Sequence, residues 1–125
     1  MKKQNLLMLS MFFMMISACA SNPNATDTFK TRTGKKVVIT AIKHASIRIT
    51  YHGKEFEIDP VGGMEPKTDY SKFPKADYIL ITHEHFDHLD KGAIASLEKK
   101  GTVMIANKNS ADILGKGKVM NNWDS

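Results

Sequence analysis

The sequence has a single cysteine, Cys19, and contains no histidine after His88. One cysteine excludes an internal disulfide, so packing must stabilise the fold. The longest apolar run, residues 6–16, is too short to span a bilayer as a helix. The formal net charge is +5. The basic residues do not interleave with aromatic ones in the way typical of nucleic-acid binding, so we expect no nucleic-acid partner.

Residues 1–18 have the features of a secretory signal peptide, because Lys2 and Lys3 precede the apolar run and small residues follow it. The letters ISAC at 16–19 resemble a bacterial lipobox, which implies cleavage before Cys19 and lipid attachment to that cysteine. An ordinary cleavage site with a chance cysteine is the alternative. We therefore expect a protein of the bacterial cell envelope, exported and held at the membrane by a lipid anchor.

Residues 19–36 are polar and contain Pro, Asn, Thr and Ser, so we expect a flexible tether there, with the folded part in 37–125. Three short segments with β-branched residues or alternating polarity predict strands. A His-Gly pair at 52–53 predicts a tight hairpin turn, in which His52 has no other role. Phe56 and Ile58 are expected to face the core. The predicted strands are VVITAI (37–42), SIRITY (46–51) and EFEID (55–59).

The second part of the chain alternates strands and helices. Residues 60–75 contain three prolines and predict a loop, and DYILIT (77–82) predicts a buried strand. Asp90 is placed to cap a helix through KGAIASLEKK (91–100). A strand at 102–106, a short helix near 109–114 and a strand near 118–120 follow. This order favours an α/β fold with helices packed outside a sheet.

The segment ITHEHFDHLD (81–90) contains three of the five histidines and follows the predicted buried strand. Imidazole and carboxylate groups are typical zinc ligands. The spacing allows His83 and His85 to hold one metal, and Asp87 and His88 to hold a second one. Two metals about 3.5–4 Å apart can activate a bridging water. A histidine-rich surface turn without metal is the alternative.

The letters THEHFDHLD (82–90) resemble the HxHxDH motif of the metallo-β-lactamase superfamily. HASIRITYHGKEFEIDP (44–60) is similar to the opening hairpin of its L-ascorbate-6-phosphate lactonase-like branch, and ADYILITHEHFDHLD (76–90) is a further match. The resemblance implies an αββα sandwich and a metal-dependent hydrolase acting on a small-molecule ester, lactone or phosphoester. It implies one or two divalent metal ions, zinc by default, with manganese or iron also suited to the ligands.

The resemblance also implies roles for individual residues. His83 and His85 would bind the first metal, and Asp87 and His88 the second. Asp87 would also act in catalysis, by orienting or deprotonating the bridging water. Two further residues match family positions next to the metals: Asp59, which supports the metal loop or else caps a turn, and His44, which lies near the active site or else is structural.

In this family the second half of the sandwich supplies two more histidines and a bridging aspartate, and the sequence after His88 has no match for them. We therefore expect the chain to be about the N-terminal half of a longer hydrolase, with weak metal binding and little activity alone. A non-catalytic metal-binding or partner-completed lipoprotein, and a remnant without function, are the alternatives. The short chain would leave apolar strands uncovered, which predicts self-association.

Overall fold

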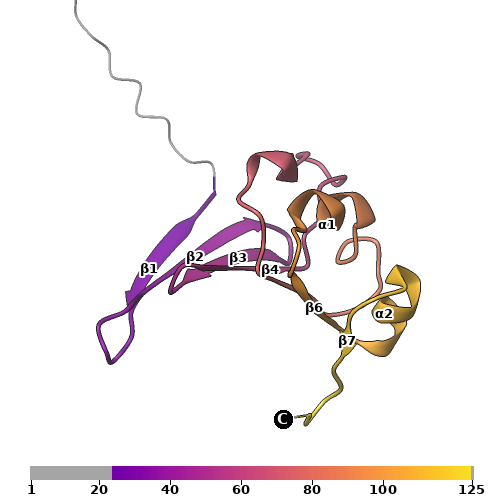
Figure 1. Ribbon diagram of the computed structural model, residues 1–125. Helices are drawn as coiled ribbons and strands as arrows, with labels where there is room; N and C mark the ends of the chain where they lie inside the picture. Colours follow the sequence, from indigo (N-terminus) through magenta and orange to yellow (C-terminus); the bar gives the residue numbers. More distant parts are fainter. Residues whose placement is uncertain (1–23, 125) are drawn as a thin grey trace, which may run out of the picture.

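One seven-stranded sheet runs through the chain in the order β1 to β7, and the helices lie on one of its faces (Figure 1). The computed structural model describes residues 24–124. Strands β1 to β4 are antiparallel neighbours, whereas β5, β6 and β7 run parallel to β4. The elements are β1 (Thr26–Lys30), β2 (Lys36–Lys43), β3 (Ser46–Tyr51), β4 (Lys54–Ile58), η1 (Tyr70–Lys72), β5 (Tyr78–Ile81), α1 (Lys91–Leu97), β6 (Val103–Ala106), α2 (Lys108–Leu114) and β7 (Lys118–Val119).

The predicted tether is wrong for its second half, because β1 lies within it and pairs along its whole length with β2. Composition suggested a linker, but threonine is also a good strand former, and residues 26–30 alternate threonine with other side chains. Gly34, with φ of +78°, closes the turn between β1 and β2. The predicted signal peptide and Cys19 lie outside the described residues. No helix of the described part is long and apolar enough to cross a bilayer.

The other predicted elements are confirmed in type and place. The His-Gly turn has positive φ at both residues, 53° at His52 and 72° at Gly53, as a two-residue hairpin of this kind requires. The helix expected through residue 100 is shorter than predicted. It ends at Leu97, because the backbone at Glu98 is extended. The amide of Lys99 then bonds to the Thr102 hydroxyl, which starts the turn into β6.

The strand alternation is correct, and the helices cover the polar face of β3 and β4. The covered face of β3 and β4 carries polar side chains, and Arg48 and Glu57 are 8% and 0% exposed. The apolar set lies on the open face, where the rings of Phe56 and Tyr78 stack at 4.7 Å and Ile47 is 36% exposed. Alternation shows which residues share a face, but it does not show which face the helices cover. Phe56 and Ile58 therefore point away from the helices, on the face that a second layer would have to cover for them to face a core.

The core lies between the helices and the covered face of β5 and β6. Ile79 and Ile81 of β5 and Met104 and Ala106 of β6 are buried there. The predicted stripe of α1 packs onto them, since Ala93, Ile94 and Leu97 are all buried. Tyr70 of η1 completes the cluster. This layer fixes α1 and the loop before it, which places residues 82–90 at the edge of the sheet.

Glu57 is a buried carboxylate within this layer, with Arg48 Nη1 3.0 Å from its Oε1. Burial raises the pKa of Glu57 from 4.5 to about 7, although Arg48 opposes this shift. A raised pKa in the folded state means that stability present below pH 4.5 is lost as the pH rises through about 7. The cost at higher pH is roughly 3 kcal/mol, at about 1.4 kcal/mol per pKa unit.

We expect Glu57→Gln to remove this part of the pH dependence. The free energy of unfolding of the wild type should fall relative to that of the variant as the pH rises from 5 to 8. Urea unfolding at several pH values measures the difference. Glu65→Gln, at an exposed position, is the matched control and should keep the slope of the wild type. Parallel pH profiles for wild type and Glu57→Gln would show that Glu57 does not titrate with folding.

Candidate metal centre

Three strand ends bring the predicted site residues to one edge of the sheet. Strands β2, β4 and β5 run in the same direction, so their carboxyl ends meet there. His44 follows β2, Asp59 follows β4, and the loop from Thr82 follows β5. Ligand sites in α/β folds lie beyond the carboxyl ends of strands, and this edge has that position.

The imidazole and carboxylate groups of the loop converge. His83, His85 and Asp87 each offer a ligand atom, and these atoms lie within 4.8 Å of one another. A second group of the same kind is His44, Asp87 and His88. The rings of His83 and His88 have centroids 3.8 Å apart, which brings the two groups side by side. Asp87 belongs to both groups, so the loop offers two adjacent metal positions joined by one carboxylate.

Asp59 supports the loop from below, as the resemblance implied. Its carboxylate is buried and accepts hydrogen bonds from the Thr82 amide (2.7 Å) and the Thr82 hydroxyl (2.6 Å). It also lies 2.9 Å from Nδ1 of His88. A carboxylate only accepts, so Nδ1 of His88 must carry the proton, and its Nε2 keeps a free lone pair. Asp59 thus fixes His88 in the tautomer that binds metal through Nε2.

His44 contacts Asp87 directly, with 3.0 Å between Nε2 and Oδ2. Its backbone has φ of +44°, an uncommon value that turns the chain from β2 into β3 and brings the ring to the loop. Burial tends to raise the pKa of Asp87, but its own backbone amide, His88 and His44 together hold it below the usual value. A pKa below the usual value makes the Asp87 carboxylate a weaker base, which suits a metal ligand better than a general base.

The predicted role of Asp90 as a helix cap is confirmed, and the same side chain also binds the 60–69 loop. Oδ1 accepts hydrogen bonds from the amides of Gly92 and Ala93 at the start of α1. Oδ2 accepts from the amides of Gly62 and Gly63, 2.9 and 3.2 Å away. One carboxylate therefore ties the 60–69 loop to the end of the metal loop. A side chain at Gly62 would meet Thr68 O at 2.8 Å, so this approach requires glycine.

Glu84, inside the histidine-rich segment, contacts the start of α2, and the sequence did not indicate this contact. Its carboxylate accepts hydrogen bonds from the side-chain amides of Asn109 (3.0 Å) and Asn107 (3.1 Å). These two hydrogen bonds lower the pKa of Glu84 to about 2, and the bond from Asn109 has the larger effect. Asn107 also caps α2. The metal loop is thus held on one side by Asp59 and on the other by the start of α2. The only sequence signal was an acidic residue between two histidines.

The remaining predicted residues lie elsewhere. His52 is in the turn between β3 and β4, at the opposite end of the sheet from the metal loop. Phe86 points away from the core and is 81% exposed between His85 and Asp87. The structure brings together six of the seven predicted site residues, and the seventh, Cys19, lies outside the described residues.

Comparison with known proteins supports the motif. Residues 38–125 match the family described as "Beta-lactamase superfamily domain". The chain belongs to the beta-lactamase superfamily. A crystal structure from Parabacteroides distasonis, described as a metal-dependent hydrolase, is 52% identical with a TM-score of 0.76, and the match covers 81% of this chain and 44% of that one. The α/β fold with a mixed sheet is therefore confirmed.

Curated relatives of the superfamily match a shorter region. A UPF0173 protein of Pyrococcus abyssi is 39% identical over 72 residues, which are 58% of this chain and 28% of the relative. A UPF0173 metal-dependent hydrolase of Staphylococcus aureus is 35% identical over 72 residues, which are 56% of this chain and 31% of the relative. The chain spans about a third of the length of these curated relatives.

Proposed function

We propose that the protein is a metal-dependent hydrolase that binds one or two divalent ions at the metal loop. The observation that carries the proposal is the pair of ligand groups sharing Asp87, each with its atoms within 4.8 Å. Imidazole nitrogens with a carboxylate oxygen are the donor set that suits zinc, and manganese or iron are compatible with it. The ligands are His83, His85, Asp87 and His88, with His44 beside Asp87.

The chain's own residues prepare the site for hydrolysis. When bound, the metal ions polarise a carbonyl or phosphoryl oxygen and lower the pKa of a bound water. Asp59 keeps His88 in one tautomer through the 2.9 Å contact, and His44 orients the Asp87 carboxylate through the 3.0 Å contact. Asp87 would serve as the carboxylate shared by the two metal positions, from which it could orient a bound water.

We infer a small-molecule ester, lactone or phosphoester as the substrate, in the manner of the L-ascorbate-6-phosphate lactonase-like branch. The hairpin residues that resemble this branch support the inference, because His44 and Asp59 both contact the metal loop. We place the protein at the cell envelope, anchored through a lipid on Cys19. The intact mass of the membrane-extracted protein tests the anchor, since Cys19→Ala should remove the mass of the lipid.

A second candidate is a metal-binding lipoprotein that is completed by another chain and has no activity alone. The open apolar face of the sheet favours it, because Phe56, Tyr78, Ile47 and their neighbours would need a covering layer. In the sandwich that the resemblance implies, a second sheet packs against this face.

Hydrolysis by the membrane-extracted protein separates the two candidates. We expect removal of metal by a chelator to lower hydrolysis of at least one ester, lactone or phosphoester by about 100-fold or more, and zinc to restore it. His85→Ala should abolish the restored activity, and His52→Ala, at the other end of the sheet, is the matched control. Metal uptake without any turnover would support the second candidate.

A further inference from the structure

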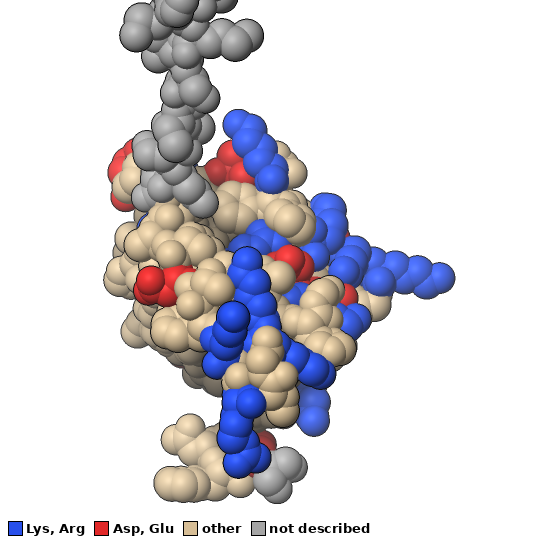
Figure 2. All heavy atoms as spheres, turned by 90° about the vertical axis from the view of Figure 1, so that its left-hand side faces the viewer, with Lys and Arg blue, Asp and Glu red and all other residues tan. Residues whose placement is uncertain are grey.

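The end of the sheet opposite to the metal loop is rich in cations. The β1–β2 turn, the β3–β4 turn and the starts of β5 and β6 all lie at this end, because of the strand directions. Figure 2 shows lysine and arginine side chains gathered over this part of the molecule, with few acidic ones among them. We call this surface the basic end. Its residues, all exposed, are Lys30, Arg32, Lys35, Lys36, Lys54, Lys75, Lys99 and Lys100.

Few acids compensate the basic end. No Asp or Glu occurs between Asp27 and Glu55. Asp77 pairs with Lys54 at 3.3 Å and with Lys99 at 3.0 Å, but it is the only acid at the start of β5. Within residues 24–124, six of these cations form no ion pair: Lys30, Arg32, Lys35, Lys36, Lys75 and Lys100. Clustered like charges repel one another, so a surface of this kind gains from an anionic partner.

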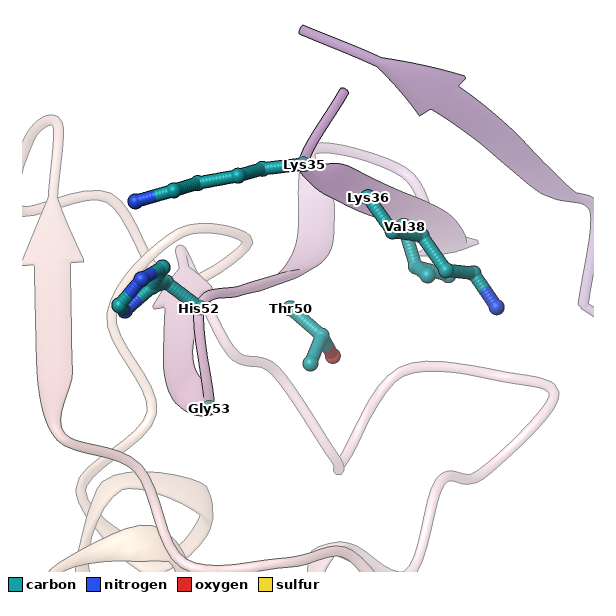
Figure 3. A pocket seen from close by; sticks show the side chains of 6 residues that line it. All are labelled: Lys35, Lys36, Val38, Thr50, His52 and Gly53. Carbon is teal, nitrogen blue, oxygen red and sulfur yellow. The ribbon is translucent and has the colours of Figure 1, made fainter. Parts of the chain in front are cut away.

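The basic end also has an open hollow of about 440 Å³. Figure 3 shows the Lys35 side chain extending on one side of it, toward His52, and the Lys36 side chain on the other side. Val38 and Thr50 form part of its lining between them. Ammonium groups on both sides of an open hollow suit a phosphate-bearing group that arrives from outside.

We propose that the basic end docks on the surface of an anionic lipid bilayer. Clusters of four to eight lysines and arginines next to a membrane anchor are typical of such docking. The chain length supports a bilayer as the partner: Cys19 precedes Thr26 by seven residues, which span at most about 24 Å. Thr26 pairs with Thr40 near the end of β2, so the tether joins β1 at the end of the sheet nearer the metal loop, and Lys30 of the basic end lies four residues further along, roughly 14 Å away. A tether of up to about 24 Å is long enough to cover this length, so a lipid on Cys19 would leave the basic end within reach of the headgroups. This step of the argument rests on the lipid anchor of the proposed function.

Docking by this end has a consequence for the site. The metal loop lies at the opposite edge of the sheet, beyond the carboxyl ends of β4 and β5. The site would then face away from the bilayer and stay open to water-soluble substrates.

Vesicle binding by a chain without lipid tests the proposal. The protein is the chain from residue 19 onward with Cys19→Ser, which keeps every residue that the structure describes. Vesicles contain either phosphatidylcholine alone or phosphatidylcholine with phosphatidylglycerol, and binding is measured by co-sedimentation. We expect binding only to the anionic vesicles and a loss of about tenfold or more when salt rises from 0.05 to 0.5 M, since salt screens such contacts.

A charge variant identifies the surface. We expect Lys30→Gln, Arg32→Gln, Lys35→Gln and Lys36→Gln together to weaken binding to anionic vesicles about tenfold or more. The matched control removes four exposed lysines from other parts of the fold, by Lys67→Gln, Lys72→Gln, Lys91→Gln and Lys108→Gln, and should change binding less than twofold. Circular dichroism confirms that both variants are folded.

Three results would overturn the proposal. They are equal binding to neutral vesicles, equal losses in the two charge variants, and tighter binding to duplex nucleic acid than to anionic vesicles. The vesicle-composition and salt experiments use no charge variant, so they decide the matter even if a variant does not fold. Because the assay uses no metal, no substrate and no lipid on the protein, its failure is distinct from a failure of the hydrolase or of the anchor at Cys19.

Discussion

Asp87→Ala is expected to reduce metal affinity by more than about 100-fold, since loss of supporting residues alone costs about 10- to 100-fold. Asp87 is the single residue common to both groups of ligand atoms. Its removal takes a ligand from each metal position and leaves His44 without its 3.0 Å partner. No other substitution in the loop affects both positions in this way, so this effect should be the largest of any single change.

Isothermal titration with zinc, together with elemental analysis after dialysis, measures the effect. Asp112→Ala is the matched control, because it removes an exposed carboxylate of α2 that is far from the loop in the chain and pairs only with Lys108. Its zinc affinity should equal that of the wild type. Full zinc stoichiometry in Asp87→Ala, at unchanged affinity, would contradict the assignment of this residue as a ligand.

Asp59→Ala should lower both stability and metal affinity. It leaves the Thr82 amide, the Thr82 hydroxyl and the His88 ring without the carboxylate that they contact. Unsatisfied groups of this kind cost about 1–3 kcal/mol each, so we expect a loss of about 3 kcal/mol after relaxation. Zinc affinity should fall by about 10- to 100-fold, because His88 loses the contact that fixes its tautomer.

Urea unfolding measures the first effect of Asp59→Ala, and zinc titration the second. Nitrogen NMR shifts of His88 add a readout that a merely structural role would not change, since they report which ring nitrogen carries the proton. Thr82→Val is the matched comparison: it removes the hydrogen bonds of the Thr82 hydroxyl, including that to Asp59, but keeps the 2.9 Å contact between Asp59 and His88, so the tautomer should stay as in the wild type. An unchanged His88 tautomer in Asp59→Ala would show that another group orients the ring.

Local patterns in the sequence were sufficient for several elements. Alternation in residues 46–51 gave the limits of β3, and the His-Gly pair gave the turn into β4, because a two-residue turn needs positive φ at both positions. The spacing of His83, His85, Asp87 and His88 identified the metal loop, since ligands so close in sequence must be close in space. The helix cap at Asp90 was also predicted, because a cap depends only on residues two and three positions further along the chain.

Contacts between segments far apart in the sequence could not be predicted from such local patterns. β1 was missed, because its strand character depends on pairing with β2 and its composition is that of a linker. The burial of Arg48 and Glu57 was also missed, since alternation does not reveal the ion pair that they form under the helices. The bonds from Asn107 and Asn109 to Glu84 join residues more than 20 positions apart, so only the fold shows them.

The central claim is that the histidine-rich loop after β5 holds the metal. Anomalous diffraction from a zinc-soaked crystal, recorded on both sides of the zinc absorption edge, tests it most directly. We predict an anomalous peak within about 2.0–2.2 Å of ligand atoms of His83 and His85, with Asp87 or His88 at the same or an adjacent peak. Strong zinc peaks elsewhere on the protein, with none beside these residues, would contradict the claim.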